Sequence, residues 1–368
     1  MIDKVTYRIA MAVTNDIATD GRLLRHAAAL TEAGHEVILI GRELPWSQPL
    51  RLPYKTLRMK LSHRKGWRFY AEYNRRLTKE LRRLKADIVW ANDTDTLSGC
   101  WMASKVNLHP ARLVMDAHEL FPEVPEIQHK PLVRWVWRMI ERMLLPQCDT
   151  CLTVCDSIAD YYRQTLGVQM TVVRNMSNQR TAASGQRKRE VTTLLYQGAV
   201  NMGRGVDWAI DAMEWLPDCR LVVAGGGDLL KQMRAYAAEK PWSDRVEFLG
   251  PVSLEKLHEL TPQADVGLVM LEDMGLSYHF ALPNRIGDFV AAGVPMVVSD
   301  LPEMARVVKR YKVGEVMREP GAQALAESVK RVLTRQWSDN DFAAARRDMD
   351  WNKEKAKLVE CVNSIMCK

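Results

Sequence analysis

The chain has 368 residues, of which 47% are hydrophobic and 26% are charged, and its formal net charge is +7. This composition excludes disordered and fibrous chains, and the length suits two domains of about 150–200 residues each. No stretch approaches the ~18 consecutive apolar residues of a membrane-spanning helix, and residues 1–13 lack the pattern of a secretory signal. Seven cysteines fit thiols in a reducing cytoplasm better than a disulfide framework. We therefore expect a cytoplasmic protein of two domains.

Strand-length apolar runs alternate with helix-length amphipathic stretches along the chain. In the first half, the runs predicted as strands are Tyr7–Thr14, Glu36–Gly41, Asp87–Asn92, Ala111–His118, Thr150–Cys155 and Met170–Asn175. Several are almost entirely apolar, which is typical of parallel strands covered on both faces. Between the first two runs, apolar residues at helical spacing predict a helix that Asp20 caps and Gly34 ends.

Basic residues are concentrated between Arg51 and Lys85. This segment holds 13 Lys and Arg residues against Glu72 and Glu80, a net charge of +11. Its aromatic residues are Tyr54, Trp67, Phe69, Tyr70 and Tyr73. Such a segment attracts an anionic membrane surface or a nucleic acid, or it forms the solvated face of a helix with a leucine stripe. We expect a membrane surface and no nucleic acid.

The polar and basic residues 177–191 interrupt the alternation and are predicted to be a linker. Beyond them the predicted strands are Thr193–Gly198, Cys219–Gly225, Val246–Gly250, Val266–Leu271, Val294–Ser299 and Val313–Met317. The pattern predicts an α/β protein with two doubly wound, Rossmann-like domains, residues 1–176 and 192–340. Residues 341–368 are helical in pattern and are expected to cross back onto the first domain. Because ligands bind beyond the carboxyl ends of such strands, the cleft between the domains is the expected site.

Two places in the first half put polar side chains at a strand end. Asn15 follows the first strand and precedes a helix whose N-terminus would stabilise an anion, although a plain turn explains it equally well. Asp116, His118 and Glu119 end another strand, and the first two share one side of it. His118 could bind a sugar hydroxyl or transfer a proton, or it could simply be held by Asp116.

In the second half, two glycine-containing strand ends are candidates for a pyrophosphate site. One holds Gly198, Arg204 and Gly205, and the other holds Gly226. Glycine permits close approach of the backbone, and an arginine supplies a fixed positive charge. Each glycine cluster is a weak signal by itself, because tight turns also need glycine.

The last candidate block begins a helix. The turn consists of Leu282, Pro283 and Asn284, and the free amides that follow it can bind an anion. Asp288 lies about one turn further on the same face, where a carboxylate could accept two ribose hydroxyls.

Two further patterns have alternative interpretations. Cys148, Cys151 and Cys155 have a spacing that suggests a metal or redox site, but no fourth thiol is near and we expect ordinary core cysteines and no metal. Trp135 and Trp137 lie among arginines and methionines, which predicts an amphipathic helix at a membrane interface or against the core.

Taken in chain order, these blocks resemble the family-4 glycosyltransferases of the GT-B fold over nearly the whole chain. The matching blocks are residues 20–22, 34–37, 92–93, 116–119, 174–175, 203–205, 224–227, 282–288 and 293–295. The resemblance implies retaining transfer of a sugar from a nucleotide sugar, UDP- or GDP-linked, in the interdomain cleft without a metal or other cofactor. By the same resemblance, His118 touches the donor sugar, Arg204 holds the pyrophosphate and Asp288 binds the ribose, and these three are the expected catalytic residues.

The chain departs from the family pattern in two respects. Phe280 occupies a position where members commonly carry a glutamate, and Gly198 and Ala199 lie where many have a second basic residue. Arg285 is the candidate to supply that missing charge. No carboxylate pair for a double displacement is evident, so we expect front-face transfer in which the leaving phosphate helps to deprotonate the acceptor.

We expect a glycan or a lipid-linked molecule as the acceptor, in surface polysaccharide or glycolipid biosynthesis, at the inner face of the plasma membrane. The alternative is a non-catalytic GT-B subunit that docks or activates a partner enzyme, which the loss of the glutamate at Phe280 favours slightly.

Overall fold

The computed structural model describes residues 5–45, 47, 49–106, 110–176 and 191–366. The chain forms two compact units, one of Met1–Arg174 with Asn352–Lys368 and one of Asn175–Trp351. The predicted linker, residues 177–191, lies outside the described residues except for Val191.

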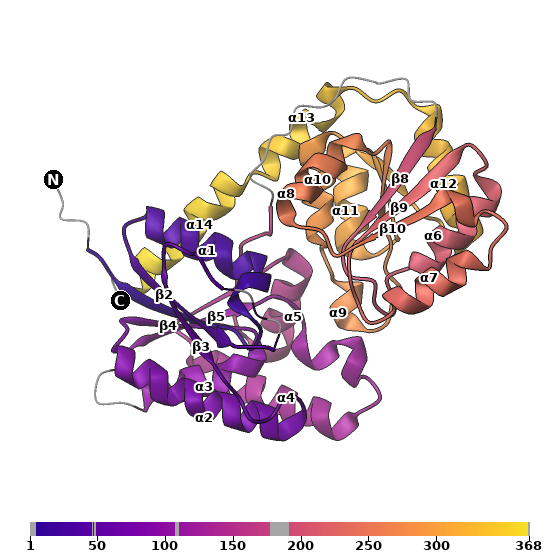
Figure 1. The fold of residues 1–368 in the computed structure, drawn as a ribbon. Helices are drawn as coiled ribbons and strands as arrows, with labels where there is room; N and C mark the ends of the chain where they lie inside the picture. Colours follow the sequence, from indigo (N-terminus) through magenta and orange to yellow (C-terminus); the bar gives the residue numbers. More distant parts are fainter. Residues whose placement is uncertain (1–4, 46, 48, 107–109, 177–190, 367–368) are drawn as a thin grey trace. The chain divides into compact units, whose positions relative to one another are not determined.

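The first unit is built on one parallel sheet of seven strands in the order β3-β2-β1-β4-β5-β6-β7. The strands are β1 (Arg8–Ala12), β2 (Glu36–Arg42), β3 (Lys55–Met59), β4 (Ile88–Asn92), β5 (Arg112–Ala117), β6 (Thr150–Thr153) and β7 (Thr171–Val172). β1 and β4 are buried almost completely, because helices cover both faces of the sheet (Figure 1).

The helices of the first unit are α1 (Gly21–Glu32), α2 (Gly66–Leu84), α3 (Thr94–Lys105), α4 (Pro131–Leu144), α5 (Asp156–Leu166) and α14 (Trp351–Met366, from Asn352 onward). Its short 3-10 turns are Ile17–Thr19, Phe121–Glu123, Pro125–Ile127 and Leu145–Gln147. Asp20 caps α1 as predicted, since its carboxylate accepts a hydrogen bond from the Leu23 N–H at 2.9 Å.

The second unit contains a parallel sheet of six strands in the order β10-β9-β8-β11-β12-β13. The strands are β8 (Thr192–Gln197), β9 (Cys219–Ala224), β10 (Val246–Gly250), β11 (Val266–Val269), β12 (Met296–Val298) and β13 (Gly314–Val316). α6 and α7 lie on one side of the sheet and α10 and α11 on the other (Figure 1).

The helices of the second unit are α6 (Val206–Ala212), α7 (Leu230–Ala238), α8 (Leu254–Leu260), α9 (Leu276–His279), α10 (Asn284–Ala292), α11 (Pro302–Tyr311), α12 (Ala322–Thr334) and α13 (Asp339–Asp348). Its 3-10 turns are Met213–Trp215, Ser243–Arg245 and Thr261–Gln263. Two parallel sheets, each covered by helices on both faces, confirm the predicted α/β class with two Rossmann-like halves.

Every strand predicted from the sequence is present, with bounds that differ by a few residues. The prediction missed β3, which lies at the sheet edge inside the basic segment. Three of its five residues, Lys55, Thr56 and Arg58, are polar, as is typical of an edge strand, so it lacks the apolar run of a central strand.

α2 carries most of the basic segment. Two of the aromatic residues that we expected to be part of its surface are instead buried. Phe69 and Tyr73 are buried, and they belong to the same inward stripe as Leu77 and Leu81. These aromatic rings are therefore core residues. Trp67, which is 74% exposed at the start of the helix, is the exception.

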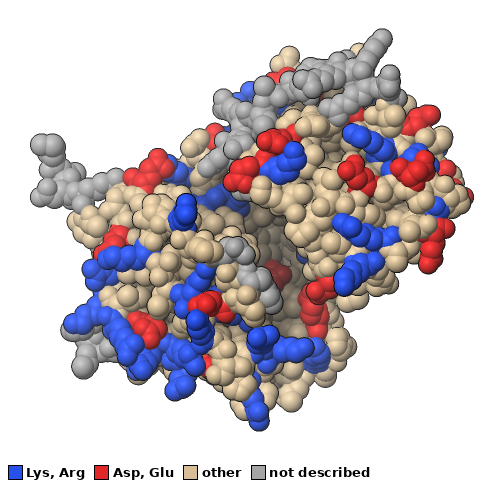
Figure 2. Space-filling view, viewed as in Figure 1, with Lys and Arg blue, Asp and Glu red and all other residues tan. Residues whose placement is uncertain are grey.

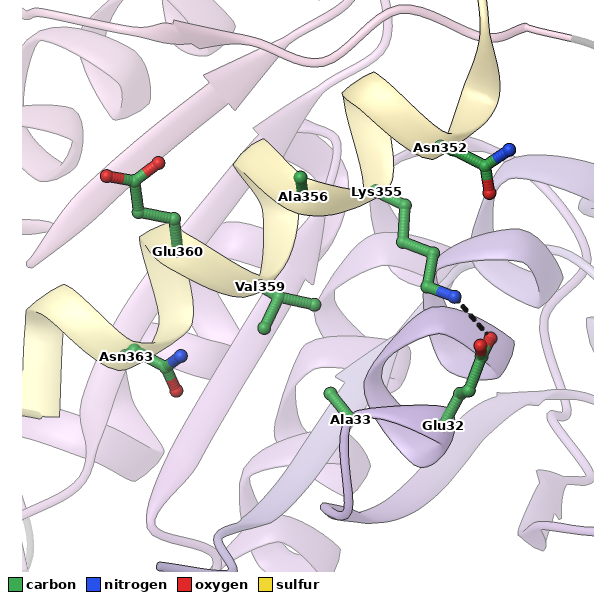
Figure 3. Close-up of a pocket in the computed structure, with 8 residues that line it drawn as sticks. All are labelled: Glu32, Ala33, Asn352, Lys355, Ala356, Val359, Glu360 and Asn363. Carbon is green, nitrogen blue, oxygen red and sulfur yellow. Dashed lines mark ion pairs between the residues drawn. The ribbon is translucent and has the colours of Figure 1, made fainter. Parts of the chain in front are cut away.

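The tail of the chain consists of two helices, α13 in the second unit and α14 in the first. α14 packs beside the end of α1, where Lys355 and Glu32 form an ion pair at 2.5 Å beside a groove of about 560 Å³ (Figure 3). The buried Glu354 accepts a hydrogen bond from the Arg174 N–H at 3.0 Å. α14 is thus held against the first unit at both α1 and the end of the segment that follows β7. Within the described ranges, no helix is both long and apolar enough to cross a membrane.

Candidate functional site

A buried ion pair lies at the carboxyl end of β5. Asp116 accepts hydrogen bonds from Arg22 Nη2 at 2.6 Å and from Arg22 Nε at 2.9 Å, and Arg22 Nη1 donates to the Val173 carbonyl at 2.7 Å. His26 Nδ1 lies 3.2 Å from the same carboxylate. Burial alone would raise the pKa of Asp116, but the charges of Arg22 and His118 hold that pKa well below its ordinary value. The carboxylate is therefore ionised inside the unit.

His118 follows this strand and faces two carboxylates. Its Nδ1 lies 3.3 Å from Asp93 Oδ2, its Nε2 lies 3.4 Å from Asp116 Oδ2, and its backbone N–H donates to Asp93 Oδ1 at 2.8 Å. The imidazole is 18% exposed. Burial lowers the pKa of His118, and the two carboxylates more than offset this and raise it. The two aspartates therefore flank the imidazole, at distances longer than those of a good N–H···O hydrogen bond.

Two more carboxylates are buried close to these residues in the first unit. Asp95 accepts a hydrogen bond from Thr14 Oγ1 at 2.5 Å, and burial raises its pKa to about 7. Glu141 of α4 accepts hydrogen bonds from Thr94 at 2.7 Å and Tyr162 at 2.8 Å, and burial raises its pKa to about 7. Nothing in the sequence pattern marks Glu141, because it lies inside an amphipathic helix.

Asn15 is exposed just after β1, and its carbonyl accepts a hydrogen bond from the Arg42 N–H at 3.1 Å. Its neighbour Asp16 is buried and accepts hydrogen bonds from Arg58 at 2.6 Å and from Ser47. Partial burial would raise the pKa of Asp16, but these hydrogen bonds and the Arg58 charge lower it. Asp16 therefore fixes the turn, while the Asn15 side chain faces solvent.

In the second unit, the loops after β8 and β9 pack backbone against backbone. The Gly198 N–H donates to the Ala224 carbonyl at 3.0 Å, and a Cβ at Gly225 would lie 1.8 Å from the Gly198 oxygen. A Cβ at Gly227 would lie 2.4 Å from the Val200 oxygen. At Gly226 a Cβ would lie 2.8 Å from Pro251. Close packing of the two loops thus accounts for Gly225 and Gly227, and contact with Pro251, which follows β10, accounts for Gly226.

Arg204 is presented by a short loop between two glycines. Gly203 and Gly205 have φ values of +72° and +64°, which disfavour any side chain. The Arg204 guanidinium lies 4.8 Å from the centre of the Tyr278 ring, a cation–π contact. Its Nε is buried and has no hydrogen-bond partner among the described residues. Buried donors are almost always paired, so this one is suited to a ligand oxygen.

α10 brings the last candidate block to the end of β8. It begins at Asn284, with Pro283 at the cap position and Leu282 just before it. Asp288, one turn into the helix, accepts a hydrogen bond from Gln197 Nε2 at 3.0 Å. Gln197 is itself buried and accepts a hydrogen bond from Thr261 at 2.8 Å, so Asp288 is held in position by a fixed chain of partners.

Arg285 is 6% exposed and is engaged within the unit. Its Nη1 donates to the Gln197 carbonyl at 2.9 Å, its Nη2 donates to the Met270 carbonyl at 3.3 Å, and the guanidinium stacks on Tyr196 at 4.8 Å. The side chain therefore joins α10 to the ends of β8 and β11. Phe280 is half-buried, and its ring packs against His279 at 5.1 Å.

The cysteines and acidic residues do not form a metal centre in the part of the chain that is described, where no group of three or more His, Cys, Asp or Glu side chains could hold an ion. Cys151 and Cys155 are buried around β6, and Cys148 Sγ lies 3.6 Å from the Leu144 carbonyl.

The structure therefore gathers the candidates in two separate groups. In the first unit, His118 joins Asp93 and Asp116. In the second unit, Gly198, Arg285 and Asp288 meet around Gln197, while Arg204 lies against Tyr278. Both groups lie at carboxyl ends of parallel strands, the edge where such folds bind ligands.

Sequence models of two glycosyltransferase families match the chain. The model described as Glycosyltransferase Family 4 matches residues 22–177, and the model described as Glycosyl transferases group 1 matches residues 178–349. Together they cover most of both units.

Two curated relatives match over part of the chain. The uncharacterized glycosyltransferase MJ1607 of Methanocaldococcus jannaschii is 26% identical over 163 residues, which are 42% of this chain and 40% of that protein. The GDP-mannose:cellobiosyl-diphosphopolyprenol alpha-mannosyltransferase of Xanthomonas oryzae is 26% identical over 160 residues, with the same coverage. The match thus spans about two fifths of the length of each relative.

Solved structures are similar over almost the full length. Sucrose-phosphate synthase from Thermosynechococcus elongatus has a TM-score of 0.80 at 18% identity and covers 98% of this chain and 99% of its own. WaaG, a glycosyltransferase involved in lipopolysaccharide biosynthesis, has a TM-score of 0.74 at 17% identity, with coverages of 95% and 98%. HepE of Anabaena, in complex with UDP and glucose, has a TM-score of 0.72 at 13% identity, with coverages of 97% and 100%. The chain therefore belongs to the family-4 type of glycosyltransferases and has their GT-B fold of two Rossmann-like domains.

Proposed function

We propose that this protein transfers a sugar, with retention of configuration and without a metal, from a UDP- or GDP-linked donor to a glycan or lipid-linked acceptor. The observation that carries the proposal is Arg204, a cation held between two glycines with a buried Nε that lacks a partner in the described structure. A donor pyrophosphate is the anion that fits such a group. Two relatives support the choice of donor, since one is named for GDP-mannose and HepE was crystallised with UDP and glucose.

The chemistry follows from where charge develops. As the sugar–phosphate bond breaks, the sugar becomes cationic and negative charge accumulates on the β-phosphate of the leaving nucleotide. Arg204 and the backbone amides at the start of α10 would stabilise that charge. The departing phosphate oxygen then takes the proton of the acceptor hydroxyl, which attacks from the same face.

Asp288 is proposed to bind the ribose of the donor. Its carboxylate accepts a hydrogen bond from Gln197, which orients it, and a carboxylate can accept several hydrogen bonds at once, such as those of the two ribose hydroxyls. Gln197 acts here as a positioning residue, because it touches Asp288 and not the reacting atoms.

His118 is proposed to donate a hydrogen bond to the donor sugar. Its ring nitrogens are 3.3 and 3.4 Å from Asp93 and Asp116, beyond the usual range of a good N–H···O bond. Exchanging one of these long contacts for a sugar hydroxyl therefore costs little, while the remaining carboxylate continues to orient the ring.

We also place the protein at an anionic membrane surface, in the synthesis of a surface polysaccharide or glycolipid. Figure 2 shows Lys and Arg side chains gathered on the first unit, where Figure 1 places α2. The exposed ones on this helix include Arg68, Arg75, Lys79, Arg82 and Arg83. Each basic residue near an anionic leaflet contributes about 1 kcal/mol at most, and the effect decays over a Debye length.

A thermal-shift panel tests the proposed donor class. The protein is heated with UDP-, GDP-, ADP- and dTDP-sugars, with and without EDTA, because a ligand that binds only the folded form raises the melting temperature. We expect a UDP- or GDP-sugar to stabilise the protein equally in both buffers. We also expect the protein to hydrolyse that donor slowly. Stabilisation only by ADP- or dTDP-sugars, or only without EDTA, would contradict the donor class or the metal independence. Binding without any hydrolysis or transfer would favour the non-catalytic alternative.

A further inference from the structure

One face of α4 exposes apolar side chains to solvent. The exposed apolar residues are Leu132 (72%), Val133 (38%), Trp135 (59%), Val136 (41%) and Met143 (53%). We call these five residues the α4 face. Leu132, Val136 and Met143 lie four and seven residues apart, which places them on one side of the helix. Contiguous apolar side chains on a protein surface mark a place where another apolar surface binds.

The opposite side of α4 is fixed in the core, so the exposure is not a sign of a loosely packed helix. The Trp137 ring packs against Tyr70 and Phe121, each at a centroid distance of 4.9 Å. The buried Glu141 is held by Thr94 and Tyr162. The helix therefore has one orientation about its axis, and the α4 face is its outward side.

The exposed charged side chains of α4 are all basic. Glu141 is the one carboxylate of α4, and it is buried. Arg134 and Arg138 pair with the buried Glu123 at 2.6 and 2.5 Å. Arg142 is exposed and has no ion pair within the described residues.

The residues just before α4 and those at the start of α2 carry charges of both signs, and the basic residues outnumber the acidic ones. Lys130 is exposed directly before α4, and Glu126 is exposed in the preceding turn. At the start of α2, Trp67 is exposed beneath the Arg68 guanidinium, which lies 5.5 Å from the ring centre. Tyr70, one turn further along α2, contacts Trp137, so this end of α2 lies beside α4.

We infer that the α4 face inserts into the headgroup region of an anionic lipid bilayer, with Trp67 beside it and Arg142, Lys130 and Arg68 at the level of the lipid phosphates. Tryptophan with flanking cations is the composition that partitions into the membrane interface. A second copy of the chain fits less well, because the like charges around the two faces would repel. The inference rests on the proposed function in one respect, since it makes the acceptor a lipid-linked molecule that the enzyme meets at the membrane.

Co-sedimentation with vesicles of phosphatidylglycerol and phosphatidylcholine tests the insertion. The test variant carries Leu132→Gln, Trp135→Gln and Met143→Gln, which keep the helix propensity and remove the apolar surface. The matched control carries Val106→Gln, Trp215→Gln and Leu333→Gln, which are exposed apolar residues elsewhere. We expect the test variant to lose at least about tenfold in vesicle binding and the control to bind like the wild type. Both should keep the wild-type melting temperature and donor hydrolysis.

Salt separates insertion from attraction by charge alone. At about 0.5 M NaCl, where surface charges are strongly screened, the wild type should keep part of its binding and the test variant should keep none. Quenching by brominated lipids should fall when Trp135 is replaced by Phe. Equal binding of the test variant and wild type, complete loss of wild-type binding at this salt, or a change from dimer to monomer in the test variant would overturn the inference. Because donor hydrolysis is measured without vesicles, its absence would instead count against the proposed function.

Discussion

The guanidinium of Arg22 donates two hydrogen bonds to the carboxylate of Asp116, at 2.6 and 2.9 Å, and both side chains are buried. With its third bond, to the Val173 carbonyl, Arg22 joins α1 to β5 and to the residue after β7. The same carboxylate also faces His118. A pair that supports the fold of the first unit thus supports the candidate site as well.

Replacing Asp116 by Asn should destabilise the first unit by about 3–5 kcal/mol, because it leaves the Arg22 charge buried without its partner. Urea unfolding of the variant against the wild type measures this. The double variant Arg22→Met, Asp116→Asn should lose less than the sum of the two single variants. Additive losses would show that the two side chains contribute independently.

Glu141 should make stability depend on pH in the acid range. Its pKa is raised by burial to about 7 from the ordinary 4.5, so the folded protein holds the proton more tightly than the unfolded chain. Stability from this group is therefore complete below pH 4.5 and is lost as the pH rises to 7, by on the order of 3 kcal/mol.

The variant Glu141→Gln stays neutral and keeps an acceptor for Thr94 and Tyr162. Its melting temperature relative to the wild type should therefore increase between pH 4.5 and 7 and remain constant above. A difference that does not change with pH would disprove the raised pKa.

Asp288→Asn should weaken donor binding without unfolding the protein, since Asp288 is only partly buried and its partner Gln197 can still bond to an amide. The ribose role makes a specific prediction. The wild type should bind the nucleotide more tightly than its 2′,3′-dideoxy analogue, and the variant should bind the two about equally in titration calorimetry. If the variant keeps the full preference for the ribose form, Asp288 does not contact the ribose.

The basic face of α2 should control the electrostatic part of membrane binding. Arg75, Lys79 and Arg83 are exposed, whereas Arg76 and Arg82 also donate to backbone carbonyls and are left unchanged. Replacing the first three by Gln should reduce binding to anionic vesicles at low salt and leave donor hydrolysis unchanged. The control replaces Lys231, Lys330 and Arg347 of the second unit by Gln, with the same loss of charge. Equal losses in both variants would mean that net charge matters and this face does not.

The fold can be predicted well from the sequence, because apolar residues recur along each helix and strand with the spacing of that element. Apolar runs and the cap at Asp20 locate the sheets and the first helix directly. β3 could not be predicted in this way, because it is an edge strand that pairs only with β2 and has few apolar residues.

The candidate site is predicted less completely, because its chemistry depends on partners far apart in the chain. Arg285 is a residue type that commonly binds phosphate, yet both of its Nη groups are bonded to carbonyls, those of Gln197 and Met270. Gly225 and Gly227 after β9 belong to a cluster that resembles a phosphate-binding loop, yet these two are required for the loops after β8 and β9 to touch. The contacts of His118 with Asp93, from the neighbouring strand, follow only from the sheet order.

Sugar transfer, or donor hydrolysis, by the variant Arg204→Ala tests the proposed donor site most directly. The control is Arg310→Ala, which removes a similar arginine stacked on Tyr311 at the far end of α11, away from the carboxyl ends of the strands. Loss of the charge that stabilises the leaving pyrophosphate should cost about 2–4 kcal/mol in the transition state, a loss of roughly 30- to 1,000-fold in rate, while the control stays at the wild-type rate. An Arg204→Ala protein that keeps nearly wild-type turnover and donor affinity would contradict the assignment of this arginine and the donor site built around it.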